Sequence, residues 1–433
     1  MTQNAPAAPA QAERSLWARL KHPLSLIGPG LITGVADDDP SGIATYSQAG
    51  AQFGLNMLWT MPLAFPLMSA IQCMCAQLGR VTGRGLAANM RAAFPRPLVL
   101  AMVALLLIAN TLNIAADEAA MGATAGMVTG VDRHIMTVGF VILTLLLQIF
   151  VPYHRYVYFL KWLTFSLLAY ALVLFTVHVP WGQVVLRTLV PQFTPNAQAA
   201  TMVVGVFGTT ISPYLFFWQA SEEVEDMNKD GGSPLLRADA ITAATELRRI
   251  RWDTWSGMFY SNITAFCIIL ATAVTLHVAG ITDIETAAQA ASALRPLAGP
   301  FAYLLFALGI IGVGLIGVPV LAGSGGYAMA EVMGWRWGLE RKVAEARGFY
   351  TVIAVSVLLA VAIQYSPINP MKALFWSAVI NGVVAVPLMA MLIILVSSKS
   401  VMGAHKSSRV LIVLGWITTL LMGGAAVGMF ISG

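Results

Sequence analysis

Apolar runs of about 20 residues recur along the chain, and they constrain its fold more than any other feature. Of the 433 residues, 58% are hydrophobic and only 10% are charged, and the mean hydropathy is +0.75. A chain this apolar needs lipid as its solvent. Each run is long enough to cross the roughly 30 Å hydrocarbon core as a helix. The sequence therefore predicts an all-α membrane protein.

The runs predict eleven transmembrane helices. They lie near residues 24–52, 57–79, 97–127, 134–152, 157–178, 201–221, 256–279, 300–330, 349–364, 370–397 and 409–431. With the N-terminus in the cytoplasm, all but four of the 25 Lys and Arg residues fall on the cytoplasmic side, as membrane proteins prefer. The exceptions are Arg133, Arg187, Arg295 and Lys372. We expect a multi-pass protein of the plasma (inner) membrane with its C-terminus extracellular or periplasmic.

Two predicted spans are interrupted by proline. The first contains "DDDPSG" at residues 37–42, where we expect the break over residues 39–42, and the sixth contains "ISPY" at residues 211–214. Proline removes a backbone donor and disfavours helix at the residue before it. Unwound backbone at membrane depth survives only where it lines a cavity or is buried in protein. We expect each of these spans to consist of two half-helices.

Breaks at corresponding places in two halves of a membrane protein are a pointer to the binding site of a transporter. The first and sixth spans fit two inverted five-helix repeats plus one additional helix. The predicted domains are a cytoplasmic tail (1–22), a first repeat (23–178), an extracellular loop (179–200), a second repeat (201–397) and a cytoplasmic loop with the last span (398–433).

The three carboxylates before the first proline predict a cation site. Free carbonyls at the C-terminus of a half-helix favour cations, and an adjacent carboxylate strengthens that preference. The alternative is that these acids cap a short extracellular loop and that the prolines are tolerated kinks. An ionisable residue at membrane depth costs several kcal/mol unless it is paired or solvated, which favours the functional interpretation.

The broken spans also resemble a known family. "GPGLITGVADDDPSGIATYSQAGAQFG" resembles the first span of the natural resistance-associated macrophage protein (NRAMP) metal-ion transporters, whose motif is Asp-Pro-Gly-Asn before an "AGAQFG"-like tail. "GTTISPYLFF" is similar to the sixth span of that family, which carries Met-Pro-His, and "LAGSGGYAMAEVMG" is a looser match in the eighth. The resemblance implies the inverted-repeat fold of amino-acid transporters and the import of divalent metal ions.

The resemblance also implies a set of ligands. Asp39 matches the metal-binding aspartate, and Thr209 matches the position that supplies a backbone carbonyl. Four positions depart from the family pattern. Ser41 replaces the motif glycine, Gly42 the metal-binding asparagine, Ser212 the methionine and Tyr214 the histidine.

These departures favour a hard cation. Loss of the methionine removes the soft ligand, and Mg²⁺ prefers oxygen ligands and keeps several waters. Asp38, together with Asp37, is suited to holding a hydrated ion through water. The pattern resembles the NRAMP-related magnesium transporter branch, and the lost histidine argues against proton coupling.

Further polar residues are candidates for the ion path. Asn110, Asn113 and Asp117 share one helical face, from which Glu118 is turned by about 100°. A hydrogen-bond network between helices is the alternative role of this face.

Other candidates lie near the inner end of the sixth span and in the tenth. Gln219 and Glu222 could belong to an intracellular exit, and Asn381 lies where the family places glutamines, with helix packing as its alternative role. The acids that follow, which we expect to form a solvated mouth, are Glu223, Glu225 and Asp226.

Together these features predict a secondary transporter that imports Mg²⁺, with Mn²⁺ as a second substrate, by alternating access. The expected partners are the bilayer and the transported ion, with no cofactor, nucleic acid or ATP; the sequence has no nucleotide-binding Gly-rich Lys-Ser/Thr loop. The first alternative is a proton-coupled Mn²⁺/Fe²⁺ importer. A sodium-coupled carrier of organic solutes is weakened by the acids at the break. An intramembrane aspartyl protease would need a second acid motif, so we expect no enzyme.

Overall fold

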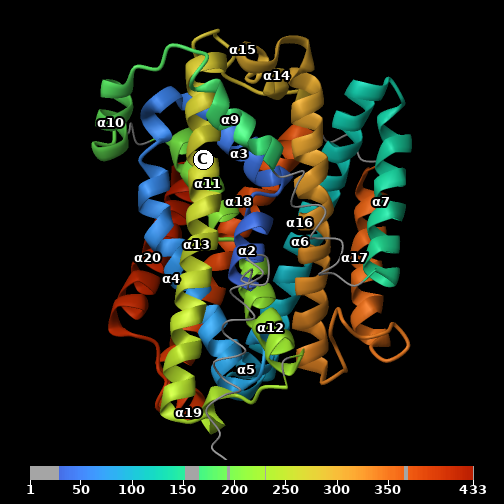
Figure 1. The fold of residues 1–433 in the computed structure, drawn as a ribbon, viewed down its shortest axis with the longest axis vertical. Helices are drawn as coiled ribbons and strands as arrows, with labels where there is room; N and C mark the ends of the chain where they lie inside the picture. The colour runs from blue at the N-terminus through green and yellow to red at the C-terminus, as the bar shows by residue number, and fades with distance from the viewer. Residues whose placement is uncertain (1–28, 152–164, 193–195, 230, 365–368, 433) are drawn as a thin grey trace, which may run out of the picture.

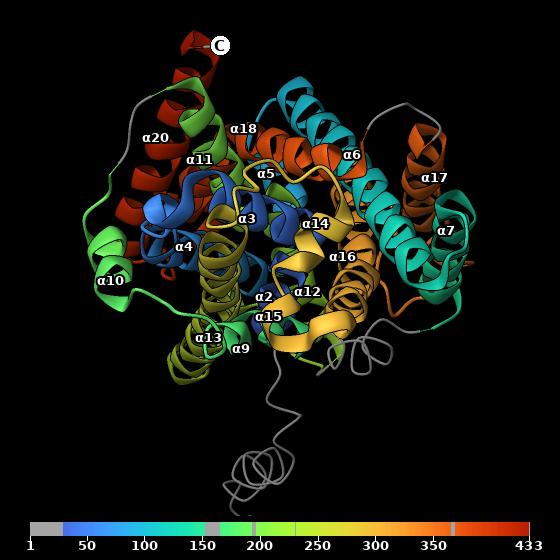
Figure 2. The ribbon, with the colours of Figure 1, turned by 90° about the horizontal axis from the view of Figure 1, so that it is seen from above.

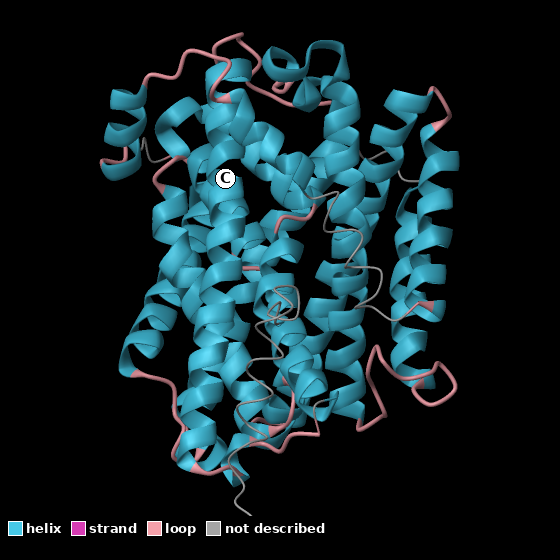
Figure 3. Cartoon of the chain, in the orientation of Figure 1, coloured by secondary structure: helices cyan, strands magenta, loops and turns pink. Residues whose placement is uncertain are grey.

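The computed structural model describes residues 29–151, 165–192, 196–229, 231–364 and 369–432, and every regular element in this part of the chain is helical (Figures 1 and 3). The full-length spanning helices are α4 (Thr60–Thr82), α6 (Arg96–Thr129), α7 (Arg133–Phe150), α13 (Ala240–Thr272), α16 (Ala302–Met333), α18 (Pro370–Ser397) and α20 (Arg409–Ser432). The remaining spans are made by α2 (Pro29–Asp37) with α3 (Pro40–Phe53), by α9 (Leu168–Val173), by α11 (Ala197–Thr210) with α12 (Pro213–Lys229), and by α17 (Arg347–Gln364). These elements match the eleven predicted spans, although the first part of the fifth lies outside the described residues.

Both predicted helix breaks are present. The second lies between Thr210 and Pro213, as expected. The first lies at Asp38 and Asp39, so the prediction that it extends to residue 42 is wrong. The reason is that Pro40 occupies the first turn of α3, where its missing N–H removes no helical hydrogen bond and its fixed φ favours the helix.

The broken helices lie in the interior of the bundle. Seen from above, α2, α3 and α12 lie near the centre, whereas α7, α17 and α20 lie at the rim (Figure 2). In an apolar 18-residue stretch of the span made by α11 and α12, 89% of the residues are buried within the protein, against 22% for α7. The unwound backbone is therefore surrounded by protein rather than lipid, as its exposed polar groups require.

Short helices lie between the spans. They are α5 (Leu86–Ala93), α10 (Trp181–Leu189), α14 (Ala287–Ser292), α15 (Arg295–Ala298) and α19 (Lys399–Met402). The predicted extracellular loop 179–200 contains α10, of which only Val184 is buried, so this segment is more ordered than expected. The apolar residues Trp181, Val184, Val185 and Leu189 fall at helical spacing, so the sequence carried a signal for this helix that the loop prediction missed.

Glycines let the half-helices approach their neighbours closely. A Cβ on Gly208 of α11 would lie 2.6 Å from the backbone nitrogen of Gly382 on α18. A Cβ on Gly30 of α2 would lie 2.7 Å from the nitrogen of Thr254 on α13. Both distances are shorter than a Cβ can tolerate, so these helices pack backbone against backbone.

An ion-pair network joins α4, α12 and α13 at one end of the bundle. Arg249 Nη2 lies 2.6 Å from Glu223 Oε2, and Arg249 Nε lies 3.0 Å from Glu246 Oε2. The same Glu246 oxygen lies 2.9 Å from Arg80 Nη2. The predicted solvated mouth is therefore wrong for Glu223, which is fully buried, because an arginine 26 residues away neutralises it. Glu225 is half-buried and accepts hydrogen bonds from the Tyr327 hydroxyl and the Leu339 N–H.

Substitution of Arg249 tests this network. Arg249→Met leaves the carboxylate of Glu223 buried without a counter-charge, and we expect the free energy of unfolding to fall by about 3–5 kcal/mol. Thermal and denaturant unfolding of the purified protein in detergent measure the change.

The matched control is Arg248→Met, which removes an exposed arginine on the same helix and should change stability by less than about 0.5 kcal/mol. The double variant Arg249→Met/Glu223→Gln should recover most of the loss. Equal stability of the Arg249 and Arg248 variants would contradict a stabilising role for the network.

Candidate functional site

The carboxylate of Asp39 is the centre of the site. Asp39 is the N-cap of α3, where its Oδ1 accepts hydrogen bonds from the Gly42 N–H (2.8 Å) and the Ser41 hydroxyl (2.6 Å). An aspartate at an N-cap satisfies backbone donors that the first helical turn leaves free. This local interaction fixes the carboxylate at the start of the half-helix, with Oδ2 turned toward other elements.

Two other helices hold the second oxygen of this carboxylate. Asp39 Oδ2 accepts hydrogen bonds from Asn113 Nδ2 of α6 and from the Tyr214 hydroxyl of α12, both at 3.1 Å. Asn113 is itself held by the Ser377 hydroxyl of α18, which donates to Asn113 Oδ1 at 2.7 Å. The Tyr214 hydroxyl has a second acceptor, the carbonyl of Ala36 in α2, at 3.2 Å. Residues from both helix breaks thus meet at one carboxylate.

The second break presents oxygen atoms beside the first. The Ser212 hydroxyl lies within hydrogen-bond distance of the carbonyls of Thr209 (2.7 Å) and Gly208 (2.9 Å). Thr209 Oγ1 is buried and has no hydrogen-bond partner among the described residues. A Cβ on Gly42 would lie 3.2 Å from that oxygen, which is tighter than most such contacts, so the glycine lets the start of α3 pack closely against the second break.

Asp37 and Asp38 form a second acidic group on the α13 side. The Ser261 hydroxyl lies 2.6 Å from Asp37 Oδ2 and 3.1 Å from Asp38 Oδ1, although its one hydrogen can serve only one of them. The other oxygen of each carboxylate is buried without a hydrogen-bond partner in the described part of the chain. Asp38 therefore contacts α13 rather than the groups that contact Asp39.

The residues of the predicted polar face of α6 contact different neighbours. Asn113 contacts Asp39, and Asp117, one turn further on, is buried with neither carboxylate oxygen bonded to a described side chain. Glu118 points instead toward α7, where the Thr144 hydroxyl lies 3.4 Å from its Oε1. Asn110 donates to the Leu321 carbonyl and the Ser324 hydroxyl of α16, which fits its alternative role in helix packing.

The remaining candidates lie at different depths. Gln219 of α12 accepts a hydrogen bond from the Thr33 hydroxyl of α2 and ties the two inner half-helices together. Glu222 is half-buried and lies 3.1 Å from the Tyr327 hydroxyl, in a separate cluster from Asp39. Asn381 is fully buried one turn beyond Ser377, and its amide has no hydrogen-bond partner among the described residues.

Acidic side chains gather in the central region. Asp37, Asp38, Asp39 and Asp117 are all buried, and none of them forms an ion pair with a Lys, Arg or His of the described residues. Nor do three His, Cys, Asp or Glu side chains in this part of the chain converge as a closed metal cage. Buried carboxylates without counter-charges are costly, and no basic side chain of the described residues offsets that cost here. The ligands available in this region are carboxylate, carbonyl and hydroxyl oxygens.

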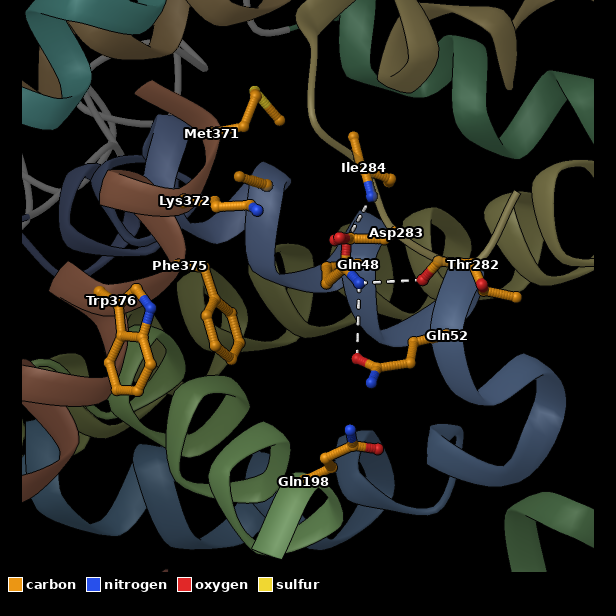
Figure 4. A pocket seen from close by; sticks show the side chains of 11 residues that line it. Gln48, Gln52, Gln198, Thr282, Asp283, Ile284, Met371, Lys372, Phe375 and Trp376 are labelled. Atoms are coloured by element: carbon orange, nitrogen blue, oxygen red, sulfur yellow. Dashed lines mark hydrogen bonds between the residues drawn. The ribbon is translucent and has the colours of Figure 1, made fainter. Parts of the chain in front are cut away.

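A polar cavity of about 470 Å³ lies at the other end of α3 (Figure 4). Its walls carry Gln48 and Gln52 of α3, Gln198 of α11, residues 282–284, and residues 371–376 of α18. Gln48 donates to the Thr282 carbonyl (3.0 Å) and accepts from the Ile284 N–H (2.9 Å). Gln48 follows Asp39 by nine residues, or about 14 Å along the helix. We call this cavity the outer vestibule, because the topology predicted from the Lys and Arg distribution places this end of α3 on the extracellular or periplasmic side.

Sequence reasoning missed several partners of the site. Tyr214 was interpreted only as a lost histidine, yet its hydroxyl contacts Asp39. Ser261 and Ser377 lie 224 and 264 residues from the groups they contact and stand in apolar helices, where a single serine gives no signal. The three glutamines of the outer vestibule were also missed, although Gln48 and Gln52 at i and i+4 could have indicated a polar face.

Comparison with known proteins identifies the family. A model of the family described as "Natural resistance-associated macrophage protein-like" matches residues 30–432. The "Divalent metal cation transporter MntH" of Klebsiella pneumoniae (strain 342) is 26% identical over 415 residues, which cover 94% of this chain and 93% of that protein. The protein of the same name from Verminephrobacter eiseniae (strain EF01-2) is 30% identical over 405 residues, which cover 89% of this chain and 84% of that protein.

Solved structures show the same fold. The manganese transporter of Eremococcus coleocola, in complex with an aromatic bis-isothiourea substituted compound, aligns with a TM-score of 0.76 at 18% identity, covering 100% of this chain and 89% of that one. Mhp1, a nucleobase-cation-symport-1 family transporter in a closed conformation, aligns with a TM-score of 0.54 at 14% identity, covering 94% and 92%. The predicted inverted-repeat fold with two broken helices is therefore confirmed. With a family model matching nearly its whole length, this chain belongs to the natural resistance-associated macrophage protein-like family.

Proposed function

We propose that this protein carries divalent metal cations across the membrane and that Asp39 binds the ion directly. The observation that carries the proposal is the buried Asp39 carboxylate, which lies where the two broken helices meet and has no basic side chain among its described contacts. Thr209 and Ser212 supply oxygen atoms from the second break. The names of the relatives, which include divalent metal cation and manganese transporters, support this class of substrate.

We further propose that Mg²⁺ is the preferred ion, with Mn²⁺ as a second substrate. The groups that contact Asp39 are hydroxyls, an amide and a backbone N–H, and position 212 carries a hydroxyl in place of a thioether. Oxygen ligands suit Mg²⁺, whereas a thioether favours softer metals. Gly42 supplies no side-chain ligand, which fits an ion that retains several of its waters. In this proposal Asp37, Asp38 and Asp117 contribute charge and hold water near the ion.

Transport in this proposal proceeds by alternating access without proton coupling. The two repeats, residues 23–178 and 201–397, rearrange around the central site, and the outer vestibule gives access along α3. Gln219 and Asn381 line the inner route, and Glu222 lies toward its exit. The N-terminus is cytoplasmic and the C-terminus extracellular or periplasmic, as the Lys and Arg distribution indicates. Position 214 carries a tyrosine hydroxyl rather than an imidazole, which supports transport that moves no proton.

Ion flux into proteoliposomes tests the function itself. Vesicles that enclose a Mg²⁺-sensitive dye or a pH dye receive Mg²⁺ or Mn²⁺ outside, with a membrane potential negative inside. We expect Mg²⁺ entry without acidification. Entry of Mn²⁺ together with protons, and no entry of Mg²⁺, would instead favour a proton-coupled transition-metal importer.

Substitution of Asp39 tests its role as the ligand. Asp39→Asn keeps the size of the side chain but removes its charge, so we expect Mg²⁺ uptake to fall at least about 30-fold, which corresponds to roughly 2 kcal/mol. The control is Asp132→Asn, which alters an exposed N-cap at the start of α7. If the Asp39 variant and the control took up Mg²⁺ equally, Asp39 would not be a ligand of the transported ion.

Substitution of Ser212 tests the origin of the metal preference. Ser212→Met places a thioether at the second break, and we expect the ratio of Mn²⁺ or Cd²⁺ uptake to Mg²⁺ uptake to rise. Ser212→Ala is the matched control, since it removes the hydroxyl without adding sulfur. A ratio that is the same in all three proteins would mean that position 212 does not set the preference.

A further inference from the structure

A long apolar groove runs along α6 at the rim of the bundle. A cavity of about 660 Å³ lies between α6 and α17, and a second of about 280 Å³ lies between α6 and α18. Leu112 and Ile363 line both cavities, so the two adjoin along α6, and we refer to them together as the groove. Along α6 the groove extends from Leu107 to Ala119, or about 18 Å.

The groove faces the lipid. Ile108, Val355 and Leu359, which line it, are 59%, 48% and 52% exposed. Water would find few partners there, because the Thr111 hydroxyl already donates to the Leu107 carbonyl at 2.8 Å. The length of the groove is close to the roughly 15 Å of one leaflet of the hydrocarbon core. An apolar space of this shape at membrane depth fits a lipid acyl chain.

Lys372 lies at one end of this groove and also lines the outer vestibule (Figure 4). It is the only Lys or Arg among the described residues that line these three cavities. Its ion pair with Glu285 is long, at 3.5 Å, and both side chains are more than half exposed, so the pair neutralises Lys372 only weakly. Trp376, one turn further along α18, lines the groove as well, and Trp and Lys are typical of the membrane interface.

We propose that an anionic phospholipid, such as phosphatidylglycerol, binds in this groove with one acyl chain along α6 and its phosphate at the Lys372 ammonium. A lysine at the vestibule of a cation pathway repels its substrate, and the phosphate removes this repulsion and attracts cations. The acyl chain also packs against Ser377, whose hydroxyl holds Asn113 against Asp39. The proposal of a lipid site does not depend on the proposed ion transport. Only the effect of the lipid on ion uptake rests on that function.

Native mass spectrometry of the whole protein tests the lipid site. The protein is released from mixed micelles that contain equal amounts of phosphatidylglycerol and phosphatidylcholine, and the retained lipids are counted. The variants are Lys372→Met for the headgroup and Val355→Trp, which fills the groove. Their controls are Lys399→Met, an exposed lysine of α19, and Val413→Trp, an exposed valine of α20 on another side of the bundle (Figure 2).

We expect the wild-type protein to retain one phosphatidylglycerol in preference to phosphatidylcholine. Lys372→Met should reduce this preference about fivefold, and Val355→Trp should abolish retention of either lipid, while both controls behave as the wild type. Equal retention of the two lipids, or variants that match their controls, would overturn the proposal. Detection of a dimer that Val355→Trp converts to a monomer would also overturn the proposal, since the groove would then be a dimer interface.

Transport measurements separate the two proposals. Phosphatidylglycerol in the liposomes should raise Mg²⁺ uptake by the wild type several-fold but not by Lys372→Met. Uptake that responds equally in both proteins would overturn the role of Lys372. Retention of the lipid with no ion flux in any liposome would leave the lipid site standing and refute the proposed function.

Discussion

The buried carboxylate of Asp39 is the interaction on which the rest of the structure depends. Its two oxygens accept hydrogen bonds from four groups, two at the start of α3, one on α6 and one on α12. A carboxylate at this depth is tolerable only when its oxygens are satisfied and its charge can be balanced. The two helix breaks must therefore face each other, because each contributes part of that environment. At both breaks the backbone loses regular helical hydrogen bonds, and this loss allows the two breaks to lie side by side.

The packing of the bundle follows from this arrangement. The half-helices come close enough to share a carboxylate because glycines let α11 approach α18 and α2 approach α13. The electrostatic interactions differ between the centre of the bundle and the end where α4, α12 and α13 form ion pairs. The ion pairs of α4, α12 and α13 balance their charges within the protein, whereas the acids of the centre do not. Charge is thus balanced within the protein where α4, α12 and α13 meet, and the proposed cation site lies among acids that have no such partner.

Much of the fold could be predicted from the sequence, because hydropathy and proline act locally. The apolar runs indicated the spans, and helical periodicity indicated that Asn113 and Glu118 face different neighbours. Interactions between distant segments could not be predicted. The first break lies earlier than expected because Pro40 starts a helix rather than interrupting one. The burial of Glu223 depends on Arg249, and the roles of Ser261 and Ser377 depend on helices more than 200 residues away.

The hydroxyl of Tyr214 has one hydrogen and two acceptors. These are Asp39 Oδ2 at the N-terminal end of α3 and the Ala36 carbonyl near the C-terminal end of α2. A cation on Oδ2 would repel that hydrogen and turn it toward Ala36. The helix α12 would then be fastened to α2 instead of α3. If Asp39 binds the ion as proposed, occupancy of the site would decide which half-helix of the first span is joined to the sixth span by this hydrogen bond.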